Sequence, residues 1–282
     1  MKKFLFLMMS LILFSACVEE NEYKISIDSV EAKKNFNSKL SITPTDSSVT
    51  VGRNIIIIAP QNEGVEYELS GYFNGQIEVY TKNTVIKLNN AYLENTFGKP
   101  VFRMKAKTEL STVKKSVNYI VTGGMGYLNN AAIQSKNSLS VGGSGVLFVK
   151  GGVWHGIEAD DVKIKGSGKY YFEGTKDGSA IKCKSLTVEP EKSFSSYFIN
   201  SKNGIKADEA VNIASGIFYF YDNDTVFKTE KPRKRDGDFS PECSIKPEIS
   251  LSGGTFHFYN NQELYQPKEI MYNPDGAVFI QD

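Results

Sequence analysis

Four isoleucines at equal steps of 24 residues constrain the fold more than any other feature of the sequence. They are Ile133, Ile157, Ile181 and Ile205, and each directly follows an alanine or a glycine. A fixed period of roughly 20–50 residues is typical of repeat proteins, in which each unit buries its apolar face only against its neighbours. The sequence therefore predicts a stack of similar units over residues 131–227.

The residues between these isoleucines have the composition and alternation of short strands. After Ile157, Val162 and Ile164 alternate with charged residues, a Gly-Ser-Gly turn occupies 166–168, and an aromatic run begins at Tyr170. The neighbouring units repeat this order, whereas no apolar period near 3.6 residues runs far enough for helical repeats. We predict an all-β fold, a right-handed, single-stranded parallel β-helix with three short strands per turn, stacked about 4.8 Å apart.

The first 17 residues have the features of a lipoprotein signal peptide. A basic start precedes the apolar run Phe4–Phe14, which is too short to span a bilayer because a spanning helix needs about 20 apolar residues. Ser15-Ala16 then precedes Cys17, the arrangement in which the thiol is acylated. We expect lipidation of Cys17 and attachment to a membrane through this lipid; ordinary signal cleavage beside an incidental cysteine is the alternative.

The rest of the chain divides into a tether and one domain. Residues 18–39 are polar and predict a tether, and residues 40–282 predict the β-helix. A proline-rich, basic stretch at 230–247 predicts a loop ejected from the stack. The net charge of +1 gives no support for nucleic-acid binding, which needs concentrated basic charge. Because no acid follows Cys17 directly, we expect a location on the outer membrane or cell surface.

Several motifs occur in the order found in a family of secreted carbohydrate-binding proteins. They include Tyr67-Glu68-Leu69-Ser70-Gly71, Gly98-Lys99-Pro100-Val101, Val117-Asn118-Tyr119-Ile120-Val121 and the Gly-Ile pairs at 156 and 204. Over residues 48–260 the chain resembles this family, whose members have the architecture of pectate lyases and act as binding modules. The resemblance implies a parallel β-helix, affinity for plant-type polysaccharides including acidic pectic chains and cellulose, and calcium binding.

Calcium binding is expected at few of the turns. The family's Gly-Ile turns commonly read Asp-Asp-Gly-Ile, whereas this chain has Trp154-His155-Gly156-Ile157 and Lys202-Asn203-Gly204-Ile205. One acid remains at Asp177, and only the stretch with Asp222 and Asp224 keeps a dense set of oxygen ligands. Since Ca²⁺ takes about six to eight oxygens, these three acids are the candidate metal ligands, and an ordinary solvated turn is the alternative.

Aromatic rings occupy both faces of the last strand of each unit. Aligning the units on their turns places Tyr197 inward and predicts an outward stripe formed by Phe148, Tyr171, Phe198, Tyr219 and His257. Exposed rings offer flat apolar faces for sugar stacking, so Phe148, Tyr171, Phe198 and Tyr219 are predicted to bind carbohydrate, with Trp154 at a turn as a further candidate. The alternative is a stripe covered by a loop or a partner subunit.

A second column carries alternating charge. The position three residues beyond each repeated isoleucine is occupied by Lys136, Asp160, Lys184 and Asp208. We interpret this column as an exposed charge ladder that helps to fix register, with each pair contributing well under about 1 kcal/mol to stability. The functional alternative is a row that binds acidic sugars.

No catalytic scheme finds a complete set of residues. Hydrolysis by paired carboxylates needs two acids on one face, about 5–9.5 Å apart, but Asp160 and Asp161 are adjacent on a strand and point opposite ways. Elimination of the pectate-lyase type uses an arginine base, and no arginine lies between positions 103 and 233. His155 and His257 have no evident serine or cysteine partner. We predict a surface-anchored lipoprotein that binds an acidic or plant-type polysaccharide without catalysis; the alternatives are a lyase or hydrolase, and an adhesive lipoprotein with a protein partner.

Overall fold

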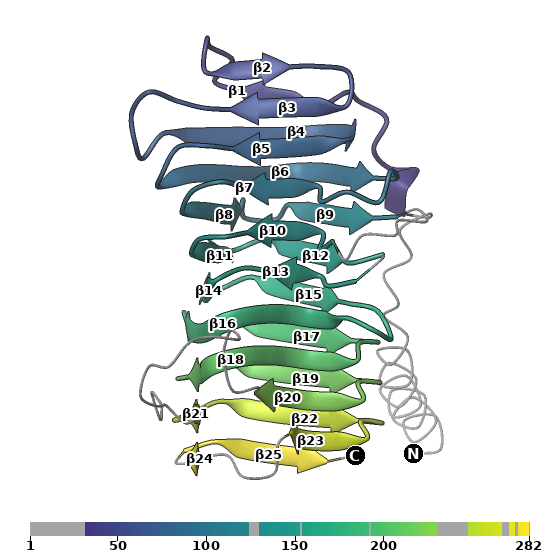
Figure 1. Ribbon diagram of the computed structural model, residues 1–282, viewed down its shortest axis with the longest axis vertical. Coiled ribbons are helices and arrows are strands. Elements are labelled where there is room, and N and C mark those ends of the chain that lie inside the picture. Colours follow the sequence, from purple (N-terminus) through teal and green to yellow (C-terminus); the bar gives the residue numbers. More distant parts are fainter. Residues whose placement is uncertain are drawn as a thin grey trace, which may run out of the picture.

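The computed structural model describes residues 32–123, 130–152, 154–191, 193–229, 248–266, 271–273 and 276–281. Its elements of regular structure are 25 β-strands, and most of them pair in parallel. The strands are stacked along one long axis in chain order, from β1–β3 at one end to β24 and β25 at the other (Figure 1). No helix in this part of the chain is long and apolar enough to cross a membrane.

The strands form three columns that run along the axis. Each strand of the regular part pairs with strands of the preceding and following turns, as β10 does with β7 and β13. Column 1 contains β3 (Ile55–Ile58), β5 (Gln76–Val79), β7 (Phe102–Met104), β10 (Ile133–Ser135), β13 (Ile157–Glu158), the first halves of β16 (Ser179–Pro190) and β18 (Asn203–Ile213), β20 (Thr225–Thr229) and β23 (Glu263–Gln266).

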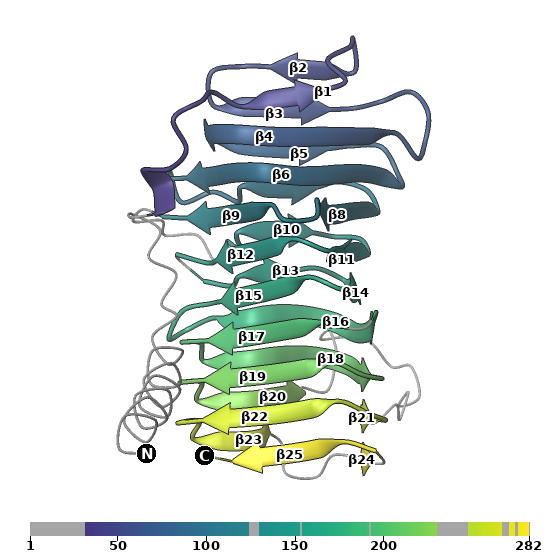
Figure 2. The same cartoon turned by 180° about the vertical axis from the view of Figure 1, so that it is seen from behind.

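Columns 2 and 3 are built in the same way, and the two lie side by side in both views (Figures 1 and 2). Column 2 contains the first halves of β4 (Glu66–Asn74) and β6 (Thr84–Asn95), β8 (Thr108–Thr112), β11 (Leu139–Gly143), β14 (Asp161–Gly166), the second halves of β16 and β18, β21 (Glu248–Leu251) and β24 (Met271–Asn273). Column 3 contains the second halves of β4 and β6, β9 (Val117–Thr122), β12 (Val146–Lys150), β15 (Lys169–Glu173), β17 (Ser195–Ile199), β19 (Ile217–Tyr221), β22 (Thr255–Tyr259) and β25 (Val278–Gln281).

The four repeated isoleucines explain the regular part of the stack. Ile157 pairs with Ile133 on one side and with Ile181 on the other, and Ile181 pairs with Ile205. All four are fully buried in one core cluster, so the 24-residue spacing predicts the register of column 1 correctly. Alternation along each strand sends every second side chain into this core, to which all three columns contribute residues.

Antiparallel strands occur only at the N-terminal end of the described residues. There β1 (Ser41–Thr43) pairs with β4, and β2 (Val49–Val51) pairs with β3. The segment before them, the described part of the predicted tether, packs on column 3. The Phe36 ring lies 5.4 Å from that of Tyr92 and 5.9 Å from that of Tyr119, and Lys33 Nζ is 2.6 Å from Glu94 Oε1. Cys17 and the predicted loop at 230–247 lie outside the described residues.

Candidate functional site

A ladder of stacked rings runs along the outer face of column 3. Its members are Tyr92, Tyr119, Phe148, Tyr171, Tyr197, Tyr219 and His257. From Tyr119 onward, successive ring centroids are 4.4–4.7 Å apart and the ring planes differ by at most 17°. Because the strands are parallel and in register, like positions meet at the interstrand distance, which is the distance at which rings stack.

Phe198 is not part of this ladder, and the predicted outward stripe is wrong at that position. Tyr171 pairs with Tyr197 and Phe172 with Phe198, so Tyr197 points outward and Phe198 points into the core, where it is fully buried. The cause lies in the preceding turn. Phe194 of that turn enters the core between Tyr170 and Phe218, at centroid distances of 5.5 and 5.8 Å, and small Ser196 takes the inward strand position. A one-residue slip exchanges the two faces of a strand.

The predicted stripe residue His257 lies in the ladder, as do the other predicted carbohydrate-binding residues of the stripe, Phe148, Tyr171 and Tyr219. Each of the latter three contacts a ring on either side, so the flat faces on which a sugar could stack are covered by neighbouring rings. Tyr171 is only 4% exposed, which agrees with this covering. The geometry accounts for the ladder through packing, and its carbohydrate binding stays a prediction.

Trp154 lies in the turn between β12 and β13, where column 3 passes into column 1. Its ring is partly exposed and meets the ring of the buried His155 edge-on, with centroids 5.3 Å apart. His155 Nδ1 accepts a hydrogen bond from the Ser179 backbone N–H at 2.8 Å, and no hydrogen bond reaches Nε2 within the described residues. Burial, with the charges of Lys182 and Lys206, lowers the pKa of His155 to about 3. Trp154 thus packs beside a neutral histidine, and its carbohydrate binding stays a prediction.

The three candidate metal ligands do not form one cluster. Asp222 Oδ1 accepts a hydrogen bond from Asn260 Nδ2 at 2.5 Å, and Asp224 Oδ1 accepts one from Gln262 Nε2 at 3.1 Å. Asp177 is exposed in a turn two levels away in the stack. Within the described ranges, no three His, Cys, Asp or Glu side chains converge closely enough to hold a metal ion. Calcium binding by these acids stays a prediction.

The predicted charge ladder lines a groove at the corner between columns 1 and 2. This corner groove has a volume of about 220 Å³ and contains Lys136, Asp160, Lys184 and Asp208. Lys184 Nζ lies 3.3 Å from Asp160 Oδ2, and a parallel pair joins Lys182 Nζ to Glu158 Oε1 at 2.7 Å. These side chains are partly exposed, so each pair contributes at most about 1 kcal/mol to stability.

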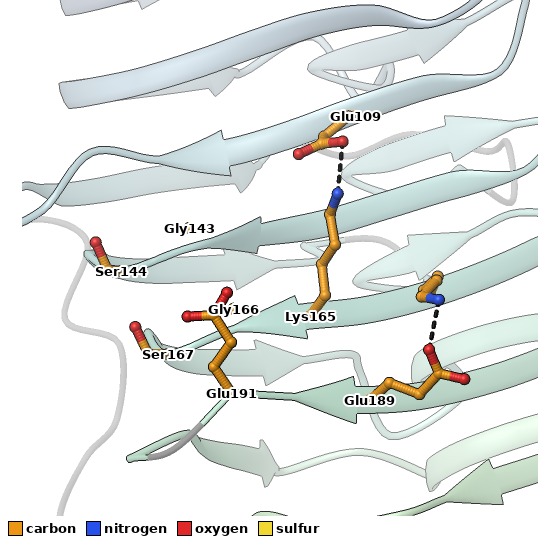
Figure 3. Close-up of a pocket in the computed structure, with 9 residues that line it drawn as sticks. Glu109, Gly143, Ser144, Lys165, Gly166, Ser167, Glu189 and Glu191 are labelled. Atoms are coloured by element: carbon orange, nitrogen blue, oxygen red, sulfur yellow. Dashed lines mark hydrogen bonds and ion pairs between the residues drawn. The ribbon is translucent and has the colours of Figure 1, made fainter.

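A larger hollow lies on the outer face of column 2 and its turns into column 3. The column-2 hollow has a volume of about 500 Å³ and is lined by Glu109, Gly143, Ser144, Lys163, Lys165, Gly166, Ser167, Glu189 and Glu191 (Figure 3). Two ion pairs cross it: Lys165 Nζ is 2.8 Å from Glu109 Oε2, and Lys163 Nζ is 2.5 Å from Glu189 Oε2. The hollow therefore offers many hydrogen-bonding groups at its surface.

The floor of the column-2 hollow needs glycine at two places. Gly143 and Gly166 have φ of +97° and +87°, in the left-handed region that other residues rarely adopt. A Cβ at Gly143 would lie 2.2 Å from Thr112 O, and one at Gly166 would lie 2.3 Å from Gly143 O. Since stacked turns leave no room for side chains here, the surface stays recessed.

A family model described as "Carbohydrate-binding domain-containing protein" matches residues 51–219, more than half of the chain. The chain belongs to this family. The matched part of the carbohydrate-binding domain holds the column-2 hollow, the corner groove and most of the ring ladder. No curated protein matches the chain.

The fold is similar to a solved structure named "Structure of the polysaccharide lyase-like protein from C. thermocellum, Gadolinium derivative". The match has a TM-score of 0.50 and 18% sequence identity, and covers 84% of this chain and 91% of that chain. At this identity the likeness concerns the fold alone. It extends the comparison beyond the family match to most of the stack.

The column-2 hollow of this carbohydrate-binding domain is not among the sites predicted from the sequence. Its signal is present in Asp161-Val162-Lys163-Ile164-Lys165, where alternation places two lysines on the outer face one pleat apart. Glycines at 142, 143 and 166 leave the neighbouring positions without side chains. The sequence does not show toward which neighbouring turn each lysine side chain extends. In the structure, Lys165 and Lys163 extend in opposite directions along the axis to pair with Glu109 and Glu189 (Figure 3).

Proposed function

We propose that this protein is a surface lipoprotein that binds polysaccharide without cleaving it. The observation that carries the proposal is the family match, because it covers the regular turns on which the two polar depressions lie. A straight stack of like turns presents the same groups at repeated intervals, which suits a polymer of repeated sugar units. The proposal includes a specific form of the all-β fold, a right-handed parallel β-helix with three strands per turn. The three columns of parallel strand pairs support it.

Binding without catalysis is favoured by the state of the acids in the column-2 hollow. Glu109 and Glu189 each pair with a lysine, so within the described residues the third acid of the hollow, Glu191, has no second free carboxylate beside it for a paired-carboxylate mechanism. Elimination from a uronate also needs a strong base and charge neutralisation, and the regular turns contain no arginine from residue 104 to residue 229. A lyase remains the second candidate, in which Lys163 or Lys165 would have to leave its ion pair to serve as base.

We expect the purified protein to be retarded in affinity gels that contain a suitable polysaccharide, with no new reducing ends and no unsaturated product. A panel of neutral, acidic and amino polysaccharides, each run with and without added calcium, measures both binding and the metal requirement. Growth of unsaturated-uronide absorbance would replace the proposal with a lyase. Migration unaffected by every glycan would favour the adhesive alternative.

The proposed anchor depends on Cys17. We expect Cys17→Ser to move the protein from the membrane fraction to the soluble fraction, because the thiol that receives the lipid is lost. A conservative control is Ser15→Ala, which keeps the thiol and should leave the protein in the membrane fraction. Unchanged membrane association of the Cys17→Ser protein, with metabolic fatty-acid labelling absent from both proteins, would contradict the anchor.

A further inference from the structure

We propose that the column-2 hollow binds a sugar residue that carries no carboxylate, and that Glu191 is the group that accepts its hydroxyls. This inference rests on the proposed polysaccharide binding and goes beyond it by assigning a site and a class of sugar. The hollow of about 500 Å³ is within the size range of ligand sites, roughly 300–1,000 Å³. Its lining comes from four successive turns, β8, β11, β14 and β16, so a chain of sugars along the axis would pass over it.

The two lysines of the hollow are already engaged. Lys165 crosses the face of Gly142, where an added Cβ would lie 3.1 Å from Lys165 Cγ, and so reaches Glu109 two turns away. Lys163 reaches the other way to Glu189 in the next turn. A ligand carboxylate would have to share a lysine that already pairs with a glutamate, and it would lie close to the negative charge of that glutamate.

Glu191 differs from the other two acids of the hollow. It lies in the turn after β16, and its carboxylate forms no ion pair or hydrogen bond within the part of the chain that the structure describes. Its backbone N–H is fixed by Gly166 O at 2.8 Å, and the side chain extends toward Gly166 and Ser167 across the recessed floor (Figure 3). An ionised carboxylate is an acceptor only, and it forms strong bonds with hydroxyl donors.

The charges of the hollow select against uronic acids. Three carboxylates and two ammonium groups line it, so its formal charge is negative, and the unpaired charge is that of Glu191. A neutral sugar donates hydroxyls to Glu191 and exchanges hydrogen bonds with the Ser144 and Ser167 hydroxyls, which both donate and accept. A uronate brings a second negative charge to this point and is repelled.

The corner groove does not provide this arrangement. Lys136, Lys182 and Lys184 balance Glu158, Asp160 and Asp208 in formal charge, and two of those acids are in ion pairs. Its volume is less than half that of the column-2 hollow. Of these two sites, the column-2 hollow is therefore the one that combines a recessed glycine floor with an unpaired acceptor.

Glu191→Ala tests the site in the full-length protein, with Glu209→Ala as the matched control. Glu209 is an exposed acid of β18 outside both hollows. In affinity gels with the neutral polysaccharide that retards the unchanged protein most, we expect Glu191→Ala to weaken binding about tenfold, the cost of a charge-assisted hydrogen bond. Glu209→Ala should bind as the unchanged protein does, and thermal melts should show both variants folded.

Charge reversal tests the class of sugar. Glu191→Lys makes the formal charge of the hollow positive, so we expect it to gain affinity for polygalacturonate that Glu209→Lys does not gain. If neutral glycans bind but Glu191→Ala binds equally well, the site is wrong while the proposed function stands. If the unchanged protein prefers polygalacturonate to every neutral glycan, the sugar class is wrong. If no glycan binds any of the proteins, the proposed function itself fails.

Discussion

Replacing Phe198 by alanine will lower the free energy of unfolding by about 3–5 kcal/mol, as expected for deleting a fully buried ring. The ring stacks on that of Phe220, with centroids 4.7 Å apart, and packs against that of Phe172 at 5.6 Å. Removing it leaves a cavity between two successive turns that stacked backbones cannot close. Urea denaturation followed by circular dichroism measures the change, and the melting temperature should fall by roughly 10 °C.

The matched control is Tyr197→Phe, one residue earlier on the opposite face. This change keeps a ring between Tyr171 and Tyr219, with centroids 4.4 and 4.6 Å away, and removes only a hydroxyl. We expect it to alter stability by less than about 1 kcal/mol. If the Phe198→Ala protein were as stable as the control, Phe198 would face outward. That is the orientation predicted when the repeat units of the chain are aligned on their turns.

The 24-residue spacing predicts column 1 because one residue type fills one core position in four successive turns. Its register follows from counting, since Ile133, Ile157, Ile181 and Ile205 pair directly. The spacing fails in column 3, where the turn before β17 is longer than its neighbours. Tyr171 and Tyr197 are 26 residues apart in sequence. The extra residues include Phe194, whose ring fills the core space that the small Ser196 at the inward strand position leaves empty. The alternation of side chains along a strand separates its two faces, but it does not show which face points into the core.

The candidate sites show the same limit. Exposed alternation predicts that Lys163 and Lys165 point outward, yet it does not show that their ion pairs leave a recess between them. Conversely, the sequence predicts free aromatic faces on column 3, and the parallel register covers them with like rings. In a stack of parallel turns, equivalent positions on successive strands carry similar side chains, which pack against one another. Stacked apolar rings therefore cover one another's faces, and open sites form where glycines leave a column without side chains.

Acid will destabilise the protein partly through His155, whose folded-state pKa is about 3. The unfolded chain takes up a proton near pH 6.5, the ordinary value, whereas the folded chain holds the ring neutral until about pH 3. Above pH 6.5 both states are neutral and this residue adds no pH dependence. As the pH falls below 6.5, protonation favours the unfolded state, so stability decreases. The expected loss is about 2 kcal/mol at pH 5 and about 3 kcal/mol at pH 4.

His155→Asn isolates this contribution because the fold already uses asparagine at the equivalent position, Asn203, two turns away. The Asn amide oxygen can accept the Ser179 backbone N–H in place of Nδ1, and it does not titrate. The smaller side chain adds a cost that is constant with pH, and every other ionisable group is common to both proteins. The difference in unfolding free energy between the two proteins should therefore be flat above pH 6.5 and shift in favour of His155→Asn below it. Urea titrations from pH 7.5 to pH 4 measure this difference, and parallel curves over the whole range would show that the ring of His155 is not held neutral by its burial.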